Sequence, residues 1–353
     1  MNETERALVP QPDRHLASLN NLATRGLNQL APRILRFPDD RKCGTVSYYD
    51  SNALGATEHD RVAARGTVLV PQGLFVNLSC LPSDPWGKIA GNAPDFLYLG
   101  ELPDGLIFDL SLPAPTTDAQ LRDVAHLYGL RRLWVSGDMV TASGLNRLST
   151  LTALRSLYLQ GLGDLEADAL GFISNLHDLE DLCISGLVQD QHIFALSGLS
   201  QQLQVLDIWG TLLTDLGCEA LASLDGLWEL NLGWNEITDQ GLRHLSGLHK
   251  LDSLILQGNR LTGIGLKNSP IMKHLTCLDL SETPCDDEAL EALTAESALE
   301  SLSLDGTLVT DDGMRWLARS NLQWVSLRNT AVTERGIGQL PESIGVEFLD
   351  SES

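Results

Sequence analysis

The sequence predicts a curved α/β solenoid, with a parallel β-sheet on its concave side and short helices on its convex side. Three observations carry this prediction. The spacing L-x-x-L-x-L recurs nine times from residue 130 onward, and successive copies begin 23 to 25 residues apart. Five copies continue with a glycine that is followed four residues later by a leucine, as in GLRHL at 241–245. One copy is too short to bury its own apolar side chains, so the copies must stack on one another.

Each copy reads as strand, turn, helix and turn. In the segment L-x-L the apolar side chains alternate with polar ones, which predicts a short strand with one buried face. The following leucines step by three and four residues, which predicts one apolar stripe of a short helix. The copies begin at Leu130, Leu154, Leu179, Leu203, Leu227, Leu251, Leu275, Leu299 and Leu322.

Two copies show the pattern most fully: LWELNLGWNEITDQGLRHLSGLHK at 227–250 and LESLSLDGTLVTDDGMRWLARSN at 299–321. They are close to 24-residue units of the type L-x-x-L-x-L-x-x-[NT]-x-[IV]-T-D-x-G-L-x-x-L. The pattern resembles the leucine-rich repeat family, and the resemblance covers about residues 105–349. It implies a horseshoe in which the outward side chains of successive strands line a concave binding face.

Polar residues at fixed places in the repeat have a structural explanation. Thr214-Asp215, Thr238-Asp239 and Thr310-Asp311 precede the helical stripe, where short side-chain oxygens can cap the first turn. The ninth position of the repeat is polar and is expected to satisfy backbone groups where strand becomes turn. It holds Asn235, Asn259, Thr211, Thr283, Thr307 and Thr330. The third copy lacks T-D-x-G, and the second has an extra residue near Gly163, so both should be irregular.

Residues 1–104 form a separate N-terminal region, and residues 105–353 hold the array with a short C-terminal cap. Residues 15–36 have apolar residues at helical spacing, while 38–66 are polar with few apolar anchors and are expected to be irregular in part. Strands are predicted at 67–70, 74–79 and 95–100. Because GLFVNLSCLP at 73–82 resembles GLIFDLSLP at 105–113, degenerate repeats should extend back to about residue 67. The region is interpreted as an atypical cap, with a docking or targeting element as the alternative.

Charge and composition narrow the classes of partner. The chain has 24 Lys and Arg against 47 Asp and Glu, a net charge of −23, which disfavours nucleic acid and anionic membranes. No run of 18 apolar residues and no secretory signal is present, so a cytoplasmic location, or delivery into a host cell if the chain is an effector, is expected. The six cysteines have no zinc spacing and are expected to be free thiols.

The candidate binding residues are aromatic and acidic side chains on outward strand positions. Counting the first leucine of each repeat as position one, outward side chains fall at positions two, three, five, seven and eight. The candidates are Trp134, Tyr158, Asp181, Asp207, Trp209, Trp228, Glu229, Trp234, Asp279 and Trp324. Aromatic residues anchor protein interfaces, and acidic residues favour a basic partner. Two structural alternatives stay open: the aromatic residues could be covered by the chain itself, and the acidic face could serve solubility alone.

No catalytic motif is found. The sequence lacks G-x-G-x-x-G after a strand, G-x-x-x-x-G-K-[ST], H-E-x-x-H and G-x-S-x-G. No cofactor, metal or catalytic residue is predicted, and the chain is not expected to be an enzyme. The leading hypothesis is a recognition module that binds a protein, expected to be basic, on its concave face. The alternative is an adaptor or effector whose N-terminal region docks onto a larger complex, such as a ubiquitin ligase or a delivery system, while the repeats select the substrate.

Overall fold

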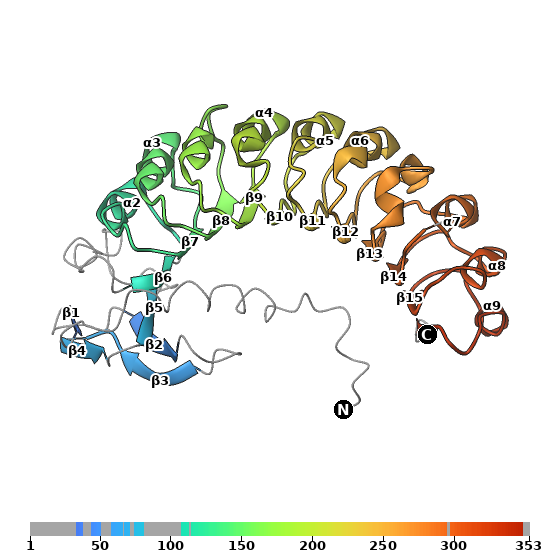
Figure 1. Cartoon of the computed structure of the whole chain (residues 1–353), viewed down its shortest axis with the longest axis horizontal. Helices are drawn as coiled ribbons and strands as arrows, with labels where there is room; N and C mark the ends of the chain where they lie inside the picture. The colour runs from blue at the N-terminus through green and yellow to red at the C-terminus, as the bar shows by residue number, and fades with distance from the viewer. Residues whose placement is uncertain are drawn as a thin grey trace.

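The structure is a computed structural model of the chain, and it describes residues 33–37, 44–50, 58–65, 67–70, 74–80, 107–112, 114–294 and 297–348. The described residues form an arc, with strands along its inner side and helices along its outer side (Figure 1). One sheet of 14 strands runs through the arc in the order β16-β15-β14-β13-β12-β11-β10-β9-β8-β7-β6-β5-β2-β3. The predicted α/β solenoid with a concave sheet and convex helices is therefore confirmed.

The strands of the arc are short and follow one another along the chain. They are β5 (Leu74–Cys80), β6 (Ile107–Leu112), β7 (Arg132–Ser136), β8 (Ser156–Leu162), β9 (Asp181–Gly186), β10 (Val205–Asp207), β11 (Glu229–Asn231), β12 (Ser253–Ile255), β13 (Cys277–Asp279), β14 (Ser301–Ser303), β15 (Trp324–Ser326) and β16 (Gly345–Glu347). All neighbours in this series pair in parallel.

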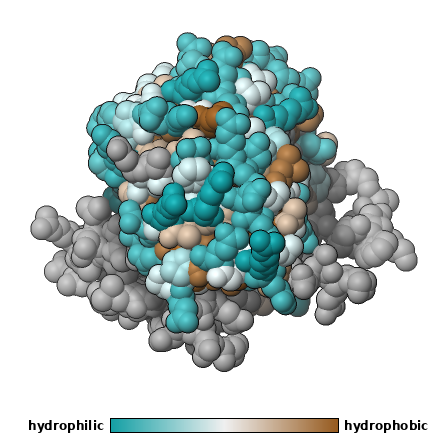
Figure 2. Space-filling view, turned by 90° about the vertical axis from the view of Figure 1, so that its right-hand side faces the viewer, coloured by the Kyte–Doolittle hydropathy of each residue, from teal (hydrophilic) through white to brown (hydrophobic). Residues whose placement is uncertain are grey.

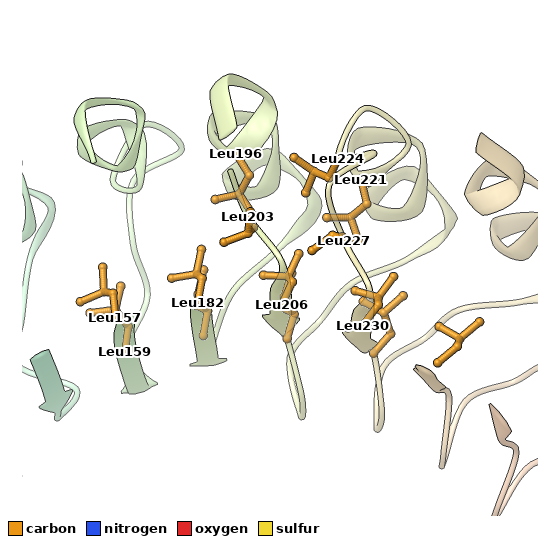
Figure 3. Packing of buried hydrophobic residues seen from close by; sticks show 14 of the residues in the cluster. Leu157, Leu159, Leu182, Leu196, Leu203, Leu206, Leu221, Leu224, Leu227 and Leu230 are labelled. Carbon is orange, nitrogen blue, oxygen red and sulfur yellow. The ribbon is translucent and has the colours of Figure 1, made fainter. Parts of the chain in front are cut away.

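The parallel register places equivalent leucines side by side. Leu206 pairs with Leu182 on one side and with Leu230 on the other, and all three are fully buried. Figure 3 shows these leucines below a second group that comes from the helical segments and includes Leu196 and Leu221. Burying one leucine contributes about 1.5–3 kcal/mol. A continuous core between the strand layer and the helix layer therefore holds the repeats together.

The convex side carries short α-helices and 3-10 helices. The α-helices are α2 (Asp118–Val124), α3 (Ala142–Asn146), α4 (Asp190–Ile193), α5 (Asp215–Leu221), α6 (Asp239–His244), α7 (Asp287–Thr294), α8 (Met314–Leu317) and α9 (Glu334–Ile337). The 3-10 helices are η3 (Arg147–Thr150), η4 (Gly171–Asn175), η5 (Phe194–Leu199), η6 (Leu245–Gly247), η7 (Ile264–Leu266) and η8 (Pro270–Lys273).

The Thr-Asp pairs do more than cap helices. Thr214 Oγ1 accepts a hydrogen bond from the backbone N–H of Leu216, so the capping prediction is confirmed for this threonine. The aspartate of the pair acts on the neighbouring repeat: both oxygens of Asp215 accept hydrogen bonds from Thr238, one from its N–H at 2.8 Å and one from its hydroxyl at 2.7 Å. Asp190 makes the same two bonds to Thr214. Each aspartate therefore links its helix to the next repeat.

The ninth position is structural, as predicted. Asn235 is buried, and its Nδ2 donates to the carbonyl oxygens of Ile208 and Leu232 at 2.8 and 3.0 Å. Its Oδ1 accepts from the Leu213 N–H and from the Thr211 hydroxyl. One side chain thus satisfies polar groups of two adjacent repeats.

The second and third repeats are irregular for the reasons that the sequence gives. The second has a longer strand whose register shifts between Leu159 and Leu162, and its convex side carries only the 3-10 helix η4. In the third, Gln189 takes the place of the capping threonine, and the four-residue α4 runs directly into η5.

The N-terminal region is only partly as predicted. The strands at 67–70 and 74–79 are confirmed as β4 (Thr67–Val70) and within β5, and β5 pairs in parallel with β6 as the repeat echo suggested. One expectation is wrong: residues 33–36, placed in a helix, form β1 (Arg33–Arg36). Residues 38–66, expected to be partly irregular, contain β2 (Gly44–Asp50) and β3 (Glu58–Ala63). The rest of the helix prediction and the strand at 95–100 lie outside the described residues.

These N-terminal strands depart from the solenoid topology. β2 pairs antiparallel with β5 and with β3, so they extend the large sheet beyond the array, whereas β1 and β4 pair antiparallel in a sheet of their own. Leu35, Val46 and Val76 from these strands are fully buried and join the single apolar core of the molecule.

The opposite end of the arc is polar. Figure 2 looks at this end, and its described surface is mostly hydrophilic with isolated apolar residues. Ile337, Leu340 and Phe348 pack partly buried against the core beneath it. The last repeat therefore covers the apolar end of the stack. Within the described residues, no helix combines the length and apolar character needed to cross a membrane.

Candidate functional site

The candidate site is the outward face of the concave sheet and the turns that follow its strands. In β10, β11 and β12 the central residue is buried and its two neighbours are partly exposed. This pattern places positions three and five on the concave side, because successive strand side chains point to opposite faces. Positions seven and eight follow at the carboxyl ends of the strands.

Charge is not spread evenly over this face. The outward positions of repeats three to eight, which we call the central concave face, hold no Lys, Arg or His. They hold the acidic residues Glu180, Asp181, Asp207, Glu229, Asp252, Asp279, Glu282, Glu300 and Asp305. The outward arginines lie in the first two repeats and in the ninth. The middle of the face is therefore strongly acidic. The expectation from the sequence did not separate this acidic middle from the ends that carry arginines.

The arginines at the two ends lie beside carboxylates. Arg132 Nη1 lies 3.4 Å from Asp109 Oδ2, and Arg155 Nη1 lies 3.0 Å from Glu180 Oε1. Burial raises the pKa of Asp109, and the nearby Arg132 opposes that effect. At the other end Arg328 pairs with Glu347. Arg155 therefore pairs with one carboxylate of the central concave face, Glu180, whereas the outward positions of repeats three to eight supply no cation of their own.

Trp134 and Tyr158 form one aromatic pair on neighbouring strands. Their ring centroids are 4.5 Å apart with an interplanar angle of 16°, and the Tyr158 hydroxyl donates a hydrogen bond to Asp181 Oδ2. Burial, with the charge of Asp181, raises the pKa of Tyr158 well above its usual value. Trp134 keeps 37% of its surface exposed. The structural alternative of strand-to-strand stacking thus applies to this pair, although one indole remains accessible.

Trp209 and Trp234 are more exposed, at 48% and 46%. Each indole leans toward a glycine of the next repeat: a Cβ on Gly233 would lie 3.0 Å from Cδ1 of Trp209, and a Cβ on Gly258 would lie 2.6 Å from Cδ2 of Trp234. The two glycines therefore provide the surface on which the rings rest. Sequence reasoning did not identify them, because the need for a missing Cβ is visible only in three dimensions.

Trp234 also has an unusual backbone. Its φ is +56°, in the left-handed region, and the same position holds a glycine with φ near +65° in neighbouring repeats, Gly210 at +61° and Gly258 at +70°. A bulky residue in this conformation costs about 1–2 kcal/mol relative to glycine. Glu282 and Asn329 have the same left-handed backbone at this position in the seventh and ninth repeats, with φ of +55° and +53°, so the conformation belongs to the repeat and is not peculiar to Trp234.

Asp207 is a carboxylate of the central concave face with a raised pKa. It lies on β10 at position five and accepts hydrogen bonds from Asn231 and from the backbone N–H of Trp209. Burial, together with the charges of Glu229 and Asp181, raises its pKa to about 6. No described residue donates a hydrogen bond to its Oδ1, which is shielded from solvent. The carboxylate thus lacks both a cation and part of its hydrogen bonding.

The remaining candidates occupy less prominent places. Trp228, Glu229, Asp279 and Trp324 are partly buried. Asp279 Oδ1 accepts a hydrogen bond from the N–H of Ser281, the same turn that Asp207 makes with Trp209.

Two exposed leucines were missed by the sequence reasoning. Leu187 and Leu212 are 49% and 43% exposed, on the turns that follow β9 and β10. The N–H of Leu212 donates to the carbonyl oxygen of Val188, so these turns are adjacent. The signal was present in the sequence: the place of Leu212 is taken by Glu236 and Arg260 in the next two repeats.

The face offers recognition chemistry rather than nucleophilic chemistry. Cys183 lies on β9 beside Asp207, and burial together with the charges of Asp207 and Asp181 raises the pKa of its thiol to about 12. Burial also raises the pKa of Cys277. A thiol with a raised pKa holds little of the nucleophilic thiolate at neutral pH. In the described part of the chain, no cluster of His, Cys, Asp and Glu has a geometry that could hold a metal ion.

Comparison with known proteins agrees with this architecture. Residues 201–261 match the family model described as leucine rich repeat. An internalin (InlF) from Listeria monocytogenes str. 4b F2365 is 22% identical, with a TM-score of 0.52 over 74% of this chain and 78% of the internalin chain. A TLR13–ssRNA13 complex is 18% identical, with a TM-score of 0.50 over 70% of this chain. This chain spans only 37% of the TLR13 chain.

At these levels of identity, the comparison establishes the fold: the array is an α/β leucine-rich repeat solenoid. No curated protein sequence matches the chain.

Proposed function

We propose that the protein is a non-enzymatic recognition module that binds a basic protein on its central concave face. The observation that carries the proposal is the coincidence of two half-exposed tryptophans with a stretch of six repeats whose outward positions hold nine carboxylates and no cation. Tryptophan supplies contact area at low entropic cost, and complementary charge accelerates encounter and rejects wrong partners. The same charge disfavours nucleic acid and anionic membranes as partners.

The face is large enough for a folded partner. Neighbouring strands lie about 4.8 Å apart, so six repeats span roughly 25 Å and the whole array considerably more. A standard interface buries about 800 Å² per partner, which this face and its flanking turns can provide. We also propose that the repeats belong to the 24-residue class that contains the motif T-D-x-G-L. A cytoplasmic location is proposed because Cys183 and Cys277 are free thiols, which persist in a reducing compartment.

The test is affinity capture with the full chain from the native lysate, using salt steps to elute bound proteins. Trp209→Ala/Trp234→Ala should lose a basic partner that the unaltered chain retains. Phe194→Ala is the matched control, because Phe194 is an aromatic residue on the convex side, in η5, and is at least as exposed (56%) as the two tryptophans. A partner retained by the double variant but lost by the control would place binding on the helices and would refute the proposal.

A second candidate function is an adaptor or effector whose N-terminal region docks onto a larger complex. It is favoured by the departure of β2 and β3 from the repeat topology, since a simple continuation of the array would pair these strands in parallel. A photo-crosslinking residue in place of the exposed Val62 on β3 tests this role in the full chain. Crosslinks from this site to a protein other than the concave-face partner would support the adaptor function. If the photoreactive residue forms crosslinks only within this chain, or none to any protein, the result would count against the adaptor function.

A further inference from the structure

The sixth and seventh repeats, which begin at Leu251 and Leu275, meet at a junction that differs from its neighbours. From the third repeat onward, three kinds of hydrogen bond join successive repeats behind the strands, and every other junction there has at least two of them. Among the described residues this junction has none of the three. We propose that it is a hinge, about which repeats one to six and repeats seven to nine move as two bodies. This inference goes beyond the proposed function and does not depend on it.

The first missing link is the aspartate–threonine bridge. At the next junction along the chain, Asp287 accepts hydrogen bonds from both the N–H and the hydroxyl of Thr310, and the same bridge recurs at the other junctions from the third repeat onward. At the hinge, Gly263 stands in place of the aspartate and Asp286 in place of the threonine. Asp286 Oδ1 instead accepts from two N–H groups at the start of its own helix, α7. Gly263 has a φ of +91°, which an aspartate rarely adopts, so the backbone itself excludes the bridge.

The second missing link is a backbone hydrogen bond at position ten of the repeat. The N–H of this residue donates to a carbonyl oxygen of the preceding repeat at 2.8–3.2 Å in repeats four, five, six, eight and nine. The donors are Leu212, Glu236, Arg260, Leu308 and Ala331, and the acceptors are Val188, Leu213, Ile237, Cys285 and Val309. In the seventh repeat the residue is Pro284, which has no N–H to donate.

The third missing link is the asparagine at position nine. Asn259 spans the junction before the hinge, because its Nδ2 donates to the Leu232 carbonyl and its Oδ1 accepts from the Ile237 N–H. The seventh repeat has Thr283 here, and its hydroxyl donates to the Leu280 carbonyl of the same repeat. The eighth and ninth repeats also have threonine at this position, but their junctions keep the first two links.

The bonds that remain at the hinge lie mainly along the strands. The Leu256 N–H donates to the Asp279 carbonyl at 2.9 Å, and one bond behind the sheet joins the Ala298 N–H to the Met272 carbonyl at 2.8 Å. β12 and β13 pair over only three residues, whereas β7, β8 and β9, which join the first three repeats, are five to seven residues long. The rest of the junction is apolar packing, which is non-directional and opposes a change of angle less than hydrogen bonds do. The strands therefore act as the pivot.

The hinge divides the concave face into two parts. Trp209 and Trp234 belong to the first body, and Trp324 belongs to the second. Rotation about β12 and β13 changes the curvature of the face while each body keeps its internal packing, as in other hinge motions. The face thereby adapts to partners of different curvature.

The test measures distances in the full chain by pulsed electron paramagnetic resonance. A ketone-bearing residue carries the nitroxide label, so the native cysteines remain in place. Labels are introduced in pairs at Gln191, Gln240, Glu288 and Arg335, which are exposed and each follow the first residue of a helix. The pair Gln240–Glu288 spans the hinge. The pairs Gln191–Gln240 and Glu288–Arg335 also span two junctions each, share its label sites and do not cross the hinge.

We expect the distance distribution of Gln240–Glu288 to be at least about twice as wide as that of either control pair. Thr283→Asn/Pro284→Glu copies Asn235-Glu236 of the fifth repeat into the hinge, and it should narrow this distribution toward the controls. Thr307→Asn/Leu308→Glu makes the same change at a linked junction and should leave the Gln240–Glu288 distribution unaltered.

Three results would overturn the inference. The first is an equal width for all three pairs, and the second is a control pair as wide as Gln240–Glu288, which would assign the motion to a label site. The third is a Thr283→Asn/Pro284→Glu chain that keeps the circular dichroism spectrum of the unaltered chain without narrowing the distribution. If this variant fails to fold, the comparison of the three pairs in the otherwise unaltered chain still decides.

Discussion

Replacing Asp207 by asparagine should stabilise the protein, and the gain should depend on pH. A buried carboxylate that lacks a cation destabilises the folded state whenever it is charged. The pKa of Asp207 is raised from 3.8 to about 6 in the folded protein. Because the folded pKa lies above the unfolded one, the folded state binds more protons between these values, and stability falls as pH rises from about 4 to about 6.

The size of the effect follows from the shift. About two pKa units correspond to about 3 kcal/mol at 1.4 kcal/mol per unit, and partial exposure of Asp207 reduces this to roughly 1.5–3 kcal/mol at pH 7. At pH 4 the carboxyl group is protonated when folded, so the gain should be below about 1 kcal/mol. Asparagine removes the charge while retaining the side-chain oxygen that accepts from the Trp209 N–H.

The assay is urea denaturation followed by far-UV circular dichroism at pH 4 and pH 7. The difference between variant and unaltered chain is compared with the same difference for Asp279→Asn, which controls for losing one negative charge from a chain of net charge −23. A gain that is equal at both pH values, or no larger than that of the control, would refute the explanation of the raised pKa. A pH-dependent gain specific to Asp207 would show that this carboxylate is retained at the expense of stability.

Three further perturbations test the fold and the site. Asn235→Ala should destabilise the protein by about 3–5 kcal/mol, because it leaves several buried backbone groups without hydrogen-bond partners. Asn235→Thr should destabilise it less, since Thr283 and Thr307 occupy the equivalent position in other repeats and donate to a backbone carbonyl there. Urea denaturation midpoints compare the two variants, and equal losses of stability would contradict this explanation. Gly258→Ala should displace the Trp234 indole and alter its fluorescence, whereas Gly210→Ala, with a similar φ and nothing within 4 Å of the added Cβ, should leave the spectrum unchanged. Tyr158 should ionise at a higher pH than an ordinary tyrosine in an ultraviolet titration of the folded chain, because its pKa is raised, and Asp181→Asn should bring its ionisation to lower pH; an ordinary tyrosine titration would oppose this.

The array could be predicted from the sequence because each apolar position is buried for the same physical reason in every repeat. Leu206, for example, is buried against its equivalents Leu182 and Leu230 on the neighbouring strands. The spacing of the leucines alone therefore determines which side chains point into the core and which point outward. The same reasoning placed Trp209 and Trp234 on outward positions, where the structure also finds them exposed. Regular stacking turns a one-dimensional pattern into a three-dimensional one.

The N-terminal strands could not be predicted in the same way. β3 reads EHDRVA, and its hydrogen bonds to β2 come from the backbone, which leaves no strong pattern in the side chains. β1 was assigned to a helix because the apolar residues around Leu35 fit both periodicities over so short a stretch.

The finer features of the site also required coordinates. The Trp234 indole lies against Gly258, which is 24 residues away in the sequence. This contact, the left-handed backbone of Trp234 and the missing hydrogen-bond donor at Asp207 Oδ1 all depend on how neighbouring repeats pack. The uneven charge, in contrast, was present in the sequence and emerges once outward positions are separated from the rest.

The most direct measurement of the central claim is site-specific photo-crosslinking in the native lysate. A photoreactive residue is placed at Trp209 and, in a second chain, at Phe194 on the convex side, and the crosslinked peptides are identified by mass spectrometry. The account predicts that position 209 captures a basic protein through a basic segment and that position 194 does not. Capture of the same protein at position 194 alone, or of an acidic segment at position 209, would contradict it.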